Sequence, residues 1–254
     1  MVQILACQVY GGGAVSRESE LLRSRLDGLD VAYDASAPER LAAYHAMLTE
    51  WNERVNLTGD ADFDVMLDRH YIDSVAALRH GALYPNGASL ADVGSGAGFP
   101  GLPLAIVRPD LRVTLIDSLG KRVKFLDAVV AELGLPNVVA MHARAEDAAH
   151  DPKLRERFDI ATARAVAATP VLLEYLLPFV RVGGHAICYK GPSESANDAN
   201  GAARLLGGGE VRSLDAPMPS QPEWRHCLLV CEKLQKTVRQ YPRKAGTPAK
   251  EPLS

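Results

Sequence analysis

The feature of this sequence with the clearest chemical meaning is a glycine-rich segment, DVGSGAGFPG, at residues 92–101. It lies between a short apolar run that predicts a strand and an apolar stretch that predicts a helix. Gly94, Gly96 and Gly98 permit tight turns with positive φ and let the backbone approach a ligand closely, because no Cβ intervenes. The segment therefore indicates a site for an adenosine-type cofactor.

Acidic residues near this segment narrow the choice of cofactor. Asp117 ends the next predicted strand, where a carboxylate can accept hydrogen bonds from both hydroxyls of an unphosphorylated ribose. Gly96, Gly98 and Gly101 also satisfy the GxGxxG pattern of dinucleotide-binding proteins. Asp92, however, suits a ligand with an ammonium and a sulfonium better than one with a pyrophosphate. We expect S-adenosylmethionine, with a nicotinamide dinucleotide as the alternative.

Further candidates follow the later predicted strands. Ala145 and Glu146 come after the third strand, where a backbone amide and a carboxylate can read the exocyclic amine of adenine. An acidic residue at a helix start is equally well explained by the helix dipole. Arg164 ends the fourth predicted strand and Lys190 ends the fifth, and both are expected at the ligand-binding edge by position alone.

The elements that must position these residues fall into two groups. Apolar residues recurring every three or four positions predict helices over residues 38–55 and 61–79. After residues 85–87, Pro-Asn-Gly, short apolar runs alternate with helical stretches, as in an α/β sheet. The predicted strands span residues 89–93, 112–117, 137–142, 158–163 and 184–190, followed by a hairpin formed by 209–214 and 225–232.

Composition excludes several classes of protein. The chain has 254 residues and a net charge of −3, so any site for a polyanion must be a local patch. Its apolar runs are far shorter than the ~18 residues that span a bilayer, and its first ten residues lack a basic start, so we expect a cytoplasmic protein without a membrane partner. The four cysteines have no zinc-ligand spacing, and we expect no metal.

Over roughly residues 38–253 the sequence resembles the glucose-inhibited division protein B family, the bacterial small-subunit rRNA guanine-N7 methyltransferases. The motifs that carry the resemblance are WNERVNLT (51–58), RHYIDS (69–74), DVGSGAGFPGLPLAI (92–106), LIDSLGKRVKFL (115–126), RAVA (164–167), YKG (189–191) and PRKAGTPAKEPL (242–253). The resemblance implies methyl transfer to a specific guanine in the 530-loop region of 16S rRNA. It also implies cofactor contacts at Gly94, Phe99, Ala145, Glu146 and Arg164.

Together these observations predict an α/β, Rossmann-like S-adenosylmethionine-dependent methyltransferase fold with a mostly parallel sheet, a terminal antiparallel hairpin and a small N-terminal helical unit. We expect a flexible extension (1–17), the helical unit (18–84), the methyltransferase domain (85–232) and a basic C-terminal tail (233–254). The tail has few apolar residues and, given the resemblance, is expected to be a disordered basic arm that orders on RNA, with a solubilising tail as the alternative.

The predicted reaction needs no catalytic residue that removes a proton. Guanine N7 carries an in-plane lone pair and no hydrogen, so it can displace the sulfonium methyl in line. Holding the two groups at near-attack distance can contribute ~7–11 kcal/mol. This agrees with the lack of a Ser/His/Asp, Cys/His or paired-carboxylate motif, and we expect no obligate general base.

Contacts with 16S rRNA, or with the small-subunit particle, must come from local basic clusters. The candidates are Lys190, Arg243 and Lys244, then Lys121, Arg122, Lys124, Lys233, Lys236, Arg239 and Lys250. His70, Asp73 and Ser74 share one side of a predicted helix and favour an interdomain hydrogen-bond network over catalysis. We expect a monomer. A nicotinamide-dependent oxidoreductase and a non-catalytic RNA-binding module remain alternatives.

Overall fold

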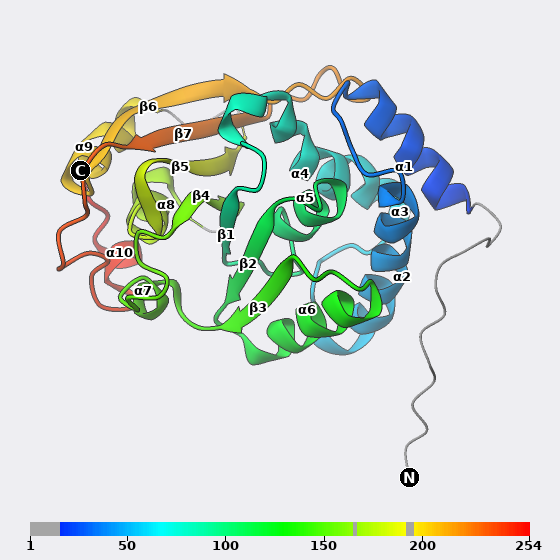
Figure 1. Cartoon of the computed structure of the whole chain (residues 1–254), viewed down its shortest axis with the longest axis horizontal. Helices are drawn as coiled ribbons and strands as arrows, with labels where there is room; N and C mark the ends of the chain where they lie inside the picture. Colours follow the sequence, from blue (N-terminus) through cyan, green and yellow to red (C-terminus); the bar gives the residue numbers. More distant parts are fainter. Residues whose placement is uncertain (1–15, 165–166, 192–195) are drawn as a thin grey trace, which may run out of the picture.

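The computed structural model describes residues 16–164, 167–191 and 196–254. Within them, a seven-stranded sheet has the order β3-β2-β1-β4-β5-β7-β6, and helices cover both of its faces (Figure 1). The strands are β1 Ser89–Val93, β2 Arg112–Asp117, β3 Val138–His142, β4 Phe158–Arg164, β5 Val180–Lys190, β6 Gly208–Asp215 and β7 Cys227–Lys233. All the predicted strands are confirmed, with ends that differ by a few residues.

The direction of the last strands distinguishes this sheet from a dinucleotide-binding one. Strands β1 to β5 pair in parallel, whereas β7 is antiparallel to both β5 and β6 and lies between them. The usual dinucleotide-binding sheet has the order 3-2-1-4-5-6. The predicted terminal hairpin is therefore confirmed, and its second strand is the one that joins the parallel sheet.

Hydrophobic side chains at successive positions of a strand point to opposite faces of the sheet, because side chains alternate along a strand. In β1, for example, Leu90 belongs to the core on one face and Ala91 to the core on the other. The first core contains α5 Gly101–Val107 and α6 Gly120–Glu132, and the second contains residues of α7 Ala145–Ala148, α8 Thr169–Leu176 and α9 Asn200–Leu205. Both faces of the central strands are thus buried, as expected of a parallel sheet.

The N-terminal helical unit shares the first of these cores. Buried Leu41, Tyr44 and Leu48 of its longest helix pack in the same cluster as α5 and α6, so unit and sheet have one continuous core. Its elements are α1 Arg17–Gly28, α2 Ala37–Val55, α3 Phe63–Met66, the π-helix η1 Leu67–Ile72, α4 Asp73–Ala76, and the short helices η2 Ala77–Arg79 and η3 Gly81–Leu83. The helix predicted over 61–79 is therefore not a regular α-helix, because a π-helical stretch interrupts it.

The chain ends depart from the predicted boundaries. Residues 1–15 of the predicted extension lie outside the described residues, and Arg17 belongs to α1, which Ser16 caps by accepting a hydrogen bond from the Ser19 amide. The prediction of an unpacked C-terminal tail is wrong. Lys233 is fully buried, and Thr237 and Tyr241 are buried as well.

Polar contacts explain why low apolar content did not leave this C-terminal segment, residues 233–254, unpacked. The Lys233 ammonium donates to the Leu177 carbonyl at 2.6 Å, contacts the Thr237 hydroxyl, and lies 3.6 Å from a Glu156 carboxylate oxygen. Burial lowers the pKa of Lys233 to about 8. The segment also contains the short helix α10 Thr247–Lys250. A buried, fully partnered cation therefore fastens the start of the segment to α8.

We predict that Lys233→Ala lowers the free energy of unfolding by about 2–4 kcal/mol, because it leaves the buried Leu177 carbonyl without its donor and removes the cation that faces Glu156. Urea denaturation measures this change, and limited proteolysis should release the C-terminal segment faster. Lys236→Ala, an exposed neighbour, is the control and should change stability by less than about 0.5 kcal/mol. Equal stability of the two variants would contradict the anchoring role.

Candidate functional site

The glycine-rich loop joins the end of β1 to the start of α5. The amides of Gly94 and Ser95 both donate to the Ile116 carbonyl, at 2.8 and 3.1 Å, and this ties the loop to the end of β2. Gly94, Gly96 and Gly98 have φ values of 76°, 59° and 107°. Side chains strongly disfavour this left-handed region, so the turn depends on glycine at these positions.

The glycines of the loop face different surroundings. A Cβ on Gly98 would lie 2.4 Å from Leu102 Cδ1, and one on Gly101 would lie 2.4 Å from Leu115 Cδ2. These two glycines are required by packing within the protein. A Cβ on Gly96 would meet a single neighbouring atom within 4 Å among the described residues, the Gly94 carbonyl oxygen at 3.9 Å. The open side of the loop is therefore at Gly96, and a ligand would lie there.

Asp117 lies beside this open side, as the sequence predicted. Its carboxylate accepts the Gly96 amide at 2.8 Å on Oδ2 and the Leu119 amide at 2.8 Å on Oδ1. Arg122 is 3.6 Å away, and Asp117 is buried. An ionised carboxylate has about four acceptor positions, so roughly two remain for the hydroxyls of a ribose.

Asp92 is the most unusual group of the site. It is fully buried, and its Oδ2 accepts the Gly101 amide at 3.0 Å, while Oδ1 has no hydrogen-bond partner among the described residues. Burial raises the pKa of Asp92 to about 7, although the Gly101 hydrogen bond opposes the rise. A buried acceptor without a partner costs about 1–3 kcal/mol. Such an oxygen fits a cationic ligand group, and an ammonium or sulfonium therefore suits this site.

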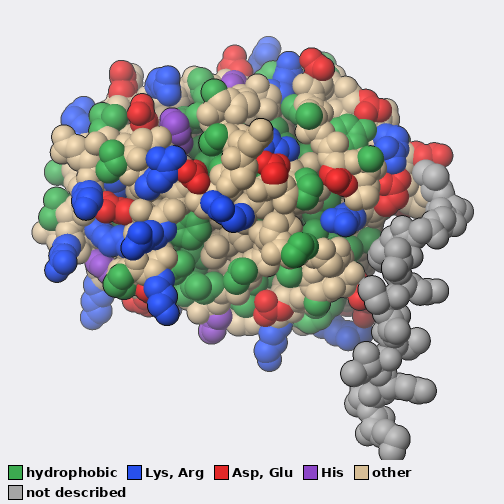
Figure 2. Space-filling view, viewed as in Figure 1, with side chains coloured by type: hydrophobic (Ala, Val, Ile, Leu, Met, Phe, Trp, Pro, Cys, Tyr) green, Lys and Arg blue, Asp and Glu red, His purple; other side chains and the backbone are tan. Residues whose placement is uncertain are grey.

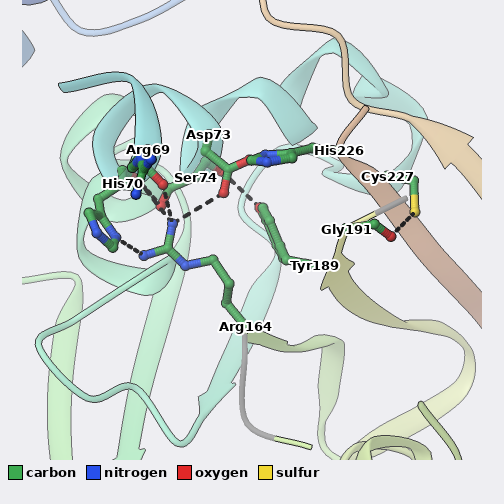
Figure 3. A network of polar contacts seen from close by, with 9 residues as sticks. All are labelled: Arg69, His70, Asp73, Ser74, Arg164, Tyr189, Gly191, His226 and Cys227. Atoms are coloured by element: carbon green, nitrogen blue, oxygen red, sulfur yellow. Dashed lines mark hydrogen bonds and ion pairs between the residues drawn. The ribbon is translucent and has the colours of Figure 1, made fainter. Parts of the chain in front are cut away.

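Arg164 joins the carboxyl end of β4 to the helical unit (Figure 3). Its Nη1 donates to the carbonyls of Arg69 and His70, at 3.2 and 3.4 Å, and to Asp73 Oδ2 at 3.2 Å. Its Nη2 lies 2.6 Å from His70 Nδ1, and its guanidinium carbon lies 5.0 Å from the centre of the Phe99 ring. The predicted cofactor residue Arg164 is therefore held mainly by the π-helix η1.

The rest of this network confirms the predicted interdomain role of His70, Asp73 and Ser74. Asp73 Oδ1 is 2.7 Å from His226 Nδ1 at the start of β7, and this contact raises the pKa of His226. The Tyr189 hydroxyl of β5 donates to the Ser74 carbonyl at 2.8 Å. In Figure 3 the side chains of Arg164 from β4, Tyr189 from β5 and His226, just before β7, point toward one turn of the helical unit.

Phe99, within the glycine-rich loop, packs the loop against the helical unit. Its ring centre is 5.6 Å from that of Tyr44, 5.4 Å from Tyr71 and 5.1 Å from His70. The Tyr44 hydroxyl also donates to the carbonyl of Ala97 within the loop. Phe99 is buried, so little of its ring is open to a ligand.

Ala145 and Glu146 begin α7 at the same edge of the sheet. Glu146 is buried, and its Oε1 accepts the amide of Gly246 at 2.9 Å. The C-terminal segment is fastened here a second time, because Arg243 forms two short contacts, at 2.9 and 2.7 Å, with the fully buried Glu174 of α8. The C-terminal segment therefore supports a predicted cofactor residue, a link that no local sequence pattern indicated.

The predicted RNA contacts have different surroundings. Lys190 donates to the Ala167 carbonyl at 2.6 Å, and Lys244 is exposed. The Arg243 guanidinium is committed to Glu174 and to the Glu251 carbonyl, so we assign it a structural role in place of RNA contact. The sequence did not indicate that a carboxylate within α8 is fully buried and needs a cation.

The side-chain clusters and helices of residues 16–164, 167–191 and 196–254 bear on metals and membranes. These residues contain no group of three or more His, Cys, Asp or Glu side chains that could hold a metal ion. None of their helices is both long enough and apolar enough to cross a bilayer.

Solved structures share this fold. Geranyl diphosphate C-methyltransferase from Streptomyces coelicolor A3(2), solved with S-adenosyl-L-homocysteine, has a TM-score of 0.53 over 75% of this chain and 98% of its own, at 14% identity. A putative sarcosine dimethylglycine methyltransferase from Galdieria sulphuraria has a TM-score of 0.51 over 69% and 89%, at 9% identity. The strand order and these two likenesses define a Rossmann-like methyltransferase fold.

Sequence comparison narrows this class to one family. The model of the rRNA small subunit methyltransferase G family matches residues 37–212. Proteins named ribosomal RNA small subunit methyltransferase G are 46% identical in Clostridium beijerinckii, over 85% of this chain and 90% of theirs, and 42% identical in Alkaliphilus metalliredigens, over 92% and 98%. The chain belongs to this family, and the resemblance seen in the sequence is confirmed.

The pKa of Asp92 leads to a prediction about cofactor binding. Since an ionised Asp92 attracts the ammonium and sulfonium, the affinity for S-adenosylmethionine should rise about tenfold from pH 6 to pH 8, as a group with a pKa of about 7 ionises. Asp92→Asn should bind more weakly and with little pH dependence, as measured by isothermal titration calorimetry.

Asp127→Asn is the control for this prediction, because Asp127 is an exposed carboxylate of α6. It should retain the native affinity and pH dependence. If the affinity of Asp92→Asn for S-adenosylmethionine rises with pH as much as that of the native chain, Asp92 is not the group responsible for the pH dependence.

Proposed function

We propose that this chain methylates N7 of a specific guanine in 16S rRNA, in the 530-loop region, using S-adenosylmethionine. Family membership supports an rRNA substrate, since the relatives' names state that they act on ribosomal RNA. The observation that carries the proposal is the open side of the loop at Gly96, whose amide is bound by the Asp117 carboxylate. We further propose that the chain acts as a monomer in the cytoplasm.

In this proposal, different residues of the site contact different parts of the cofactor. Gly94, Gly96 and Gly98 provide the backbone surface, and Asp117 accepts the ribose hydroxyls with its remaining acceptor positions. Asp92 neutralises the cationic amino-acid end. Ala145 and Glu146 contact the adenine, and Phe99 and Arg164 line the side of the cofactor site. Lys190 and Lys244 contact the RNA.

The protein's contribution to the reaction is to hold and orient the reactants. When bound, S-adenosylmethionine supplies an electrophilic methyl group. Guanine N7 has a lone pair and no hydrogen to lose, so no side chain has to accept a proton. His70 fits this account: burial and the nearby Arg164 lower its pKa to about 4, and its Nδ1 faces the Arg164 guanidinium. His70 is therefore neutral at physiological pH, and its Nδ1 is already in contact with the Arg164 guanidinium.

The absence of a general base predicts a flat pH profile for the chemical step. With both substrates saturating, the single-turnover rate should change less than about twofold between pH 6.5 and 8.5, because no essential group has to lose a proton. Rapid-quench measurement of labelled methyl transfer gives this rate. A rate that climbs about tenfold per pH unit would show that deprotonation of a catalytic group is required.

Gly96 offers a test of the site itself. Gly96→Asn keeps a residue type that tolerates positive φ but fills the open side of the loop, so the affinity for S-adenosylmethionine should fall about ten- to a hundredfold. Gly134→Asn is matched to it, with a φ of 57° and open space around it at the end of α6, and should bind normally.

Methyl transfer to 16S rRNA should change in the same way as the affinity for S-adenosylmethionine. Gly134→Asn should be active, and Gly96→Asn should be nearly inactive while it still binds RNA. Mapping the label to guanine N7 then tests the substrate. Native protein that binds 16S rRNA without transferring label would replace the enzyme by a non-catalytic RNA-binding module. Normal activity of Gly96→Asn would show that the cofactor lies elsewhere.

A further inference from the structure

A groove lined mainly by basic side chains lies at the edge of the sheet opposite the candidate cofactor site. It forms where the loop before β4 meets the chain after β7, and it has a volume of about 660 Å³. Its lining consists of His150, Pro152, Arg155, Glu156, Arg157, Lys236 and Arg239. Because β4 runs from Phe158 to Arg164, this basic groove is at the amino end of the strand whose carboxyl end faces the cofactor site.

The floor of the basic groove is a fixed part of the fold. Arg155 donates through Nη1 to the carbonyls of Ala149 and Tyr241, at 3.0 and 2.8 Å, and through Nη2 to those of Thr237 and Val238, at 2.9 and 3.3 Å. It thereby joins two segments far apart in the sequence. Carbonyl groups satisfy the hydrogen bonds of a guanidinium but do not cancel its charge, so the floor remains positive.

The remaining charges of the groove add to this positive field. Arg157, Lys236 and Arg239 are exposed, and the charge of Arg239 adds to burial in lowering the pKa of Arg155. The acidic lining residue, Glu156, accepts the Thr237 amide at 2.8 Å and lies 3.6 Å from buried Lys233. Figure 2 shows Lys and Arg side chains gathered on the side that carries α7, α10 and the C-terminal segment. The net charge of the whole chain is −3, so this concentration is local.

We propose that the basic groove binds phosphate groups of the RNA backbone and forms a second contact with the substrate, remote from the reacting edge. The inference rests on the proposed function and deepens it. Arginine forks match phosphate oxygens, and several cations along one groove suit a polyanion. The lining includes no Phe, Tyr or Trp, so it offers charge and no stacking surface for bases. Contacts of this kind fix position without reading sequence.

The two contacts constrain the size of the substrate. The seven residues of β4 separate the groove from the cofactor edge by roughly 20 Å, at about 3.3 Å per residue. Several nucleotides are needed to cover that distance. The groove should therefore act on long, folded rRNA and be without effect on a short oligonucleotide that carries the target guanine.

The test is a triple variant, Arg157→Gln with Lys236→Gln and Arg239→Gln, which spares Arg155 and the cofactor site. Its affinity for 16S rRNA should fall at least about tenfold near 0.1 M salt, and the slope of log affinity against log salt should become shallower by about 2–3. Filter binding over a KCl series measures both. The kcat/KM for full-length 16S rRNA should fall with affinity, while that for a short stem-loop changes less than about twofold.

The control is a second triple variant with the same change in charge, Arg112→Gln with Arg204→Gln and Arg212→Gln, at exposed positions outside the groove lining. It should keep the native salt slope. If the two triple variants show the same slope, or if the short stem-loop loses as much activity as 16S rRNA, the groove proposal is overturned while the methyltransferase stands. Failure of the native chain to methylate any rRNA would instead overturn the proposed function.

Discussion

The site depends on one buried carboxylate. Asp92 lies in the middle of the sheet, in register with Leu115 on one neighbouring strand and Thr162 on the other. The Gly101 amide at the start of α5 satisfies its Oδ2, and a Cβ on Gly101 would lie 2.7 Å from that oxygen. Ionising a buried acid costs stability as the pH rises toward its raised pKa, since the unfolded chain releases that proton at lower pH. In the proposed complex a bound cation would offset this cost, so the feature that strains the free protein would favour the cofactor.

The helical unit is what keeps this region buried. Tyr44 reaches the carbonyl of Ala97 in the loop, and Phe99 packs among rings of the unit. Arg164 binds the carbonyls of the π-helix η1, and Arg164 also lowers the pKa of Asp92 toward its ordinary value. The unit and the sheet therefore act together: the irregular helix exposes carbonyls that hold an arginine next to the cofactor edge. Separating the helical unit from the sheet would expose the core they share.

Sequence patterns predicted the parts of the fold that depend on residues close together in the sequence. Alternation and turn residues located the strands, and glycine spacing indicated that the loop and Asp117 come together, as the hydrogen bond from the Gly96 amide shows. The patterns failed where the determining contact joins distant segments. The C-terminal segment packs through Lys233, which binds the Leu177 carbonyl just after α8, and through Arg243, which binds Glu174 within α8. Both of these partners are far away in the sequence. The π-helix likewise has a partner far away in the sequence, because its Arg69 carbonyl accepts a hydrogen bond from Arg164 of β4. Residues with polar, long-range partners resemble surface residues when read in isolation.

A crystal structure with S-adenosylmethionine bound tests the central claim most directly. The account predicts that the ligand's ammonium lies about 3 Å from Asp92 Oδ1, or is joined to it by one water molecule. The ribose hydroxyls should then lie at the same distance from the Asp117 carboxylate, with the loop at Gly96 against the ligand. A ligand bound elsewhere, or one that leaves Asp92 Oδ1 still without a partner, would contradict it.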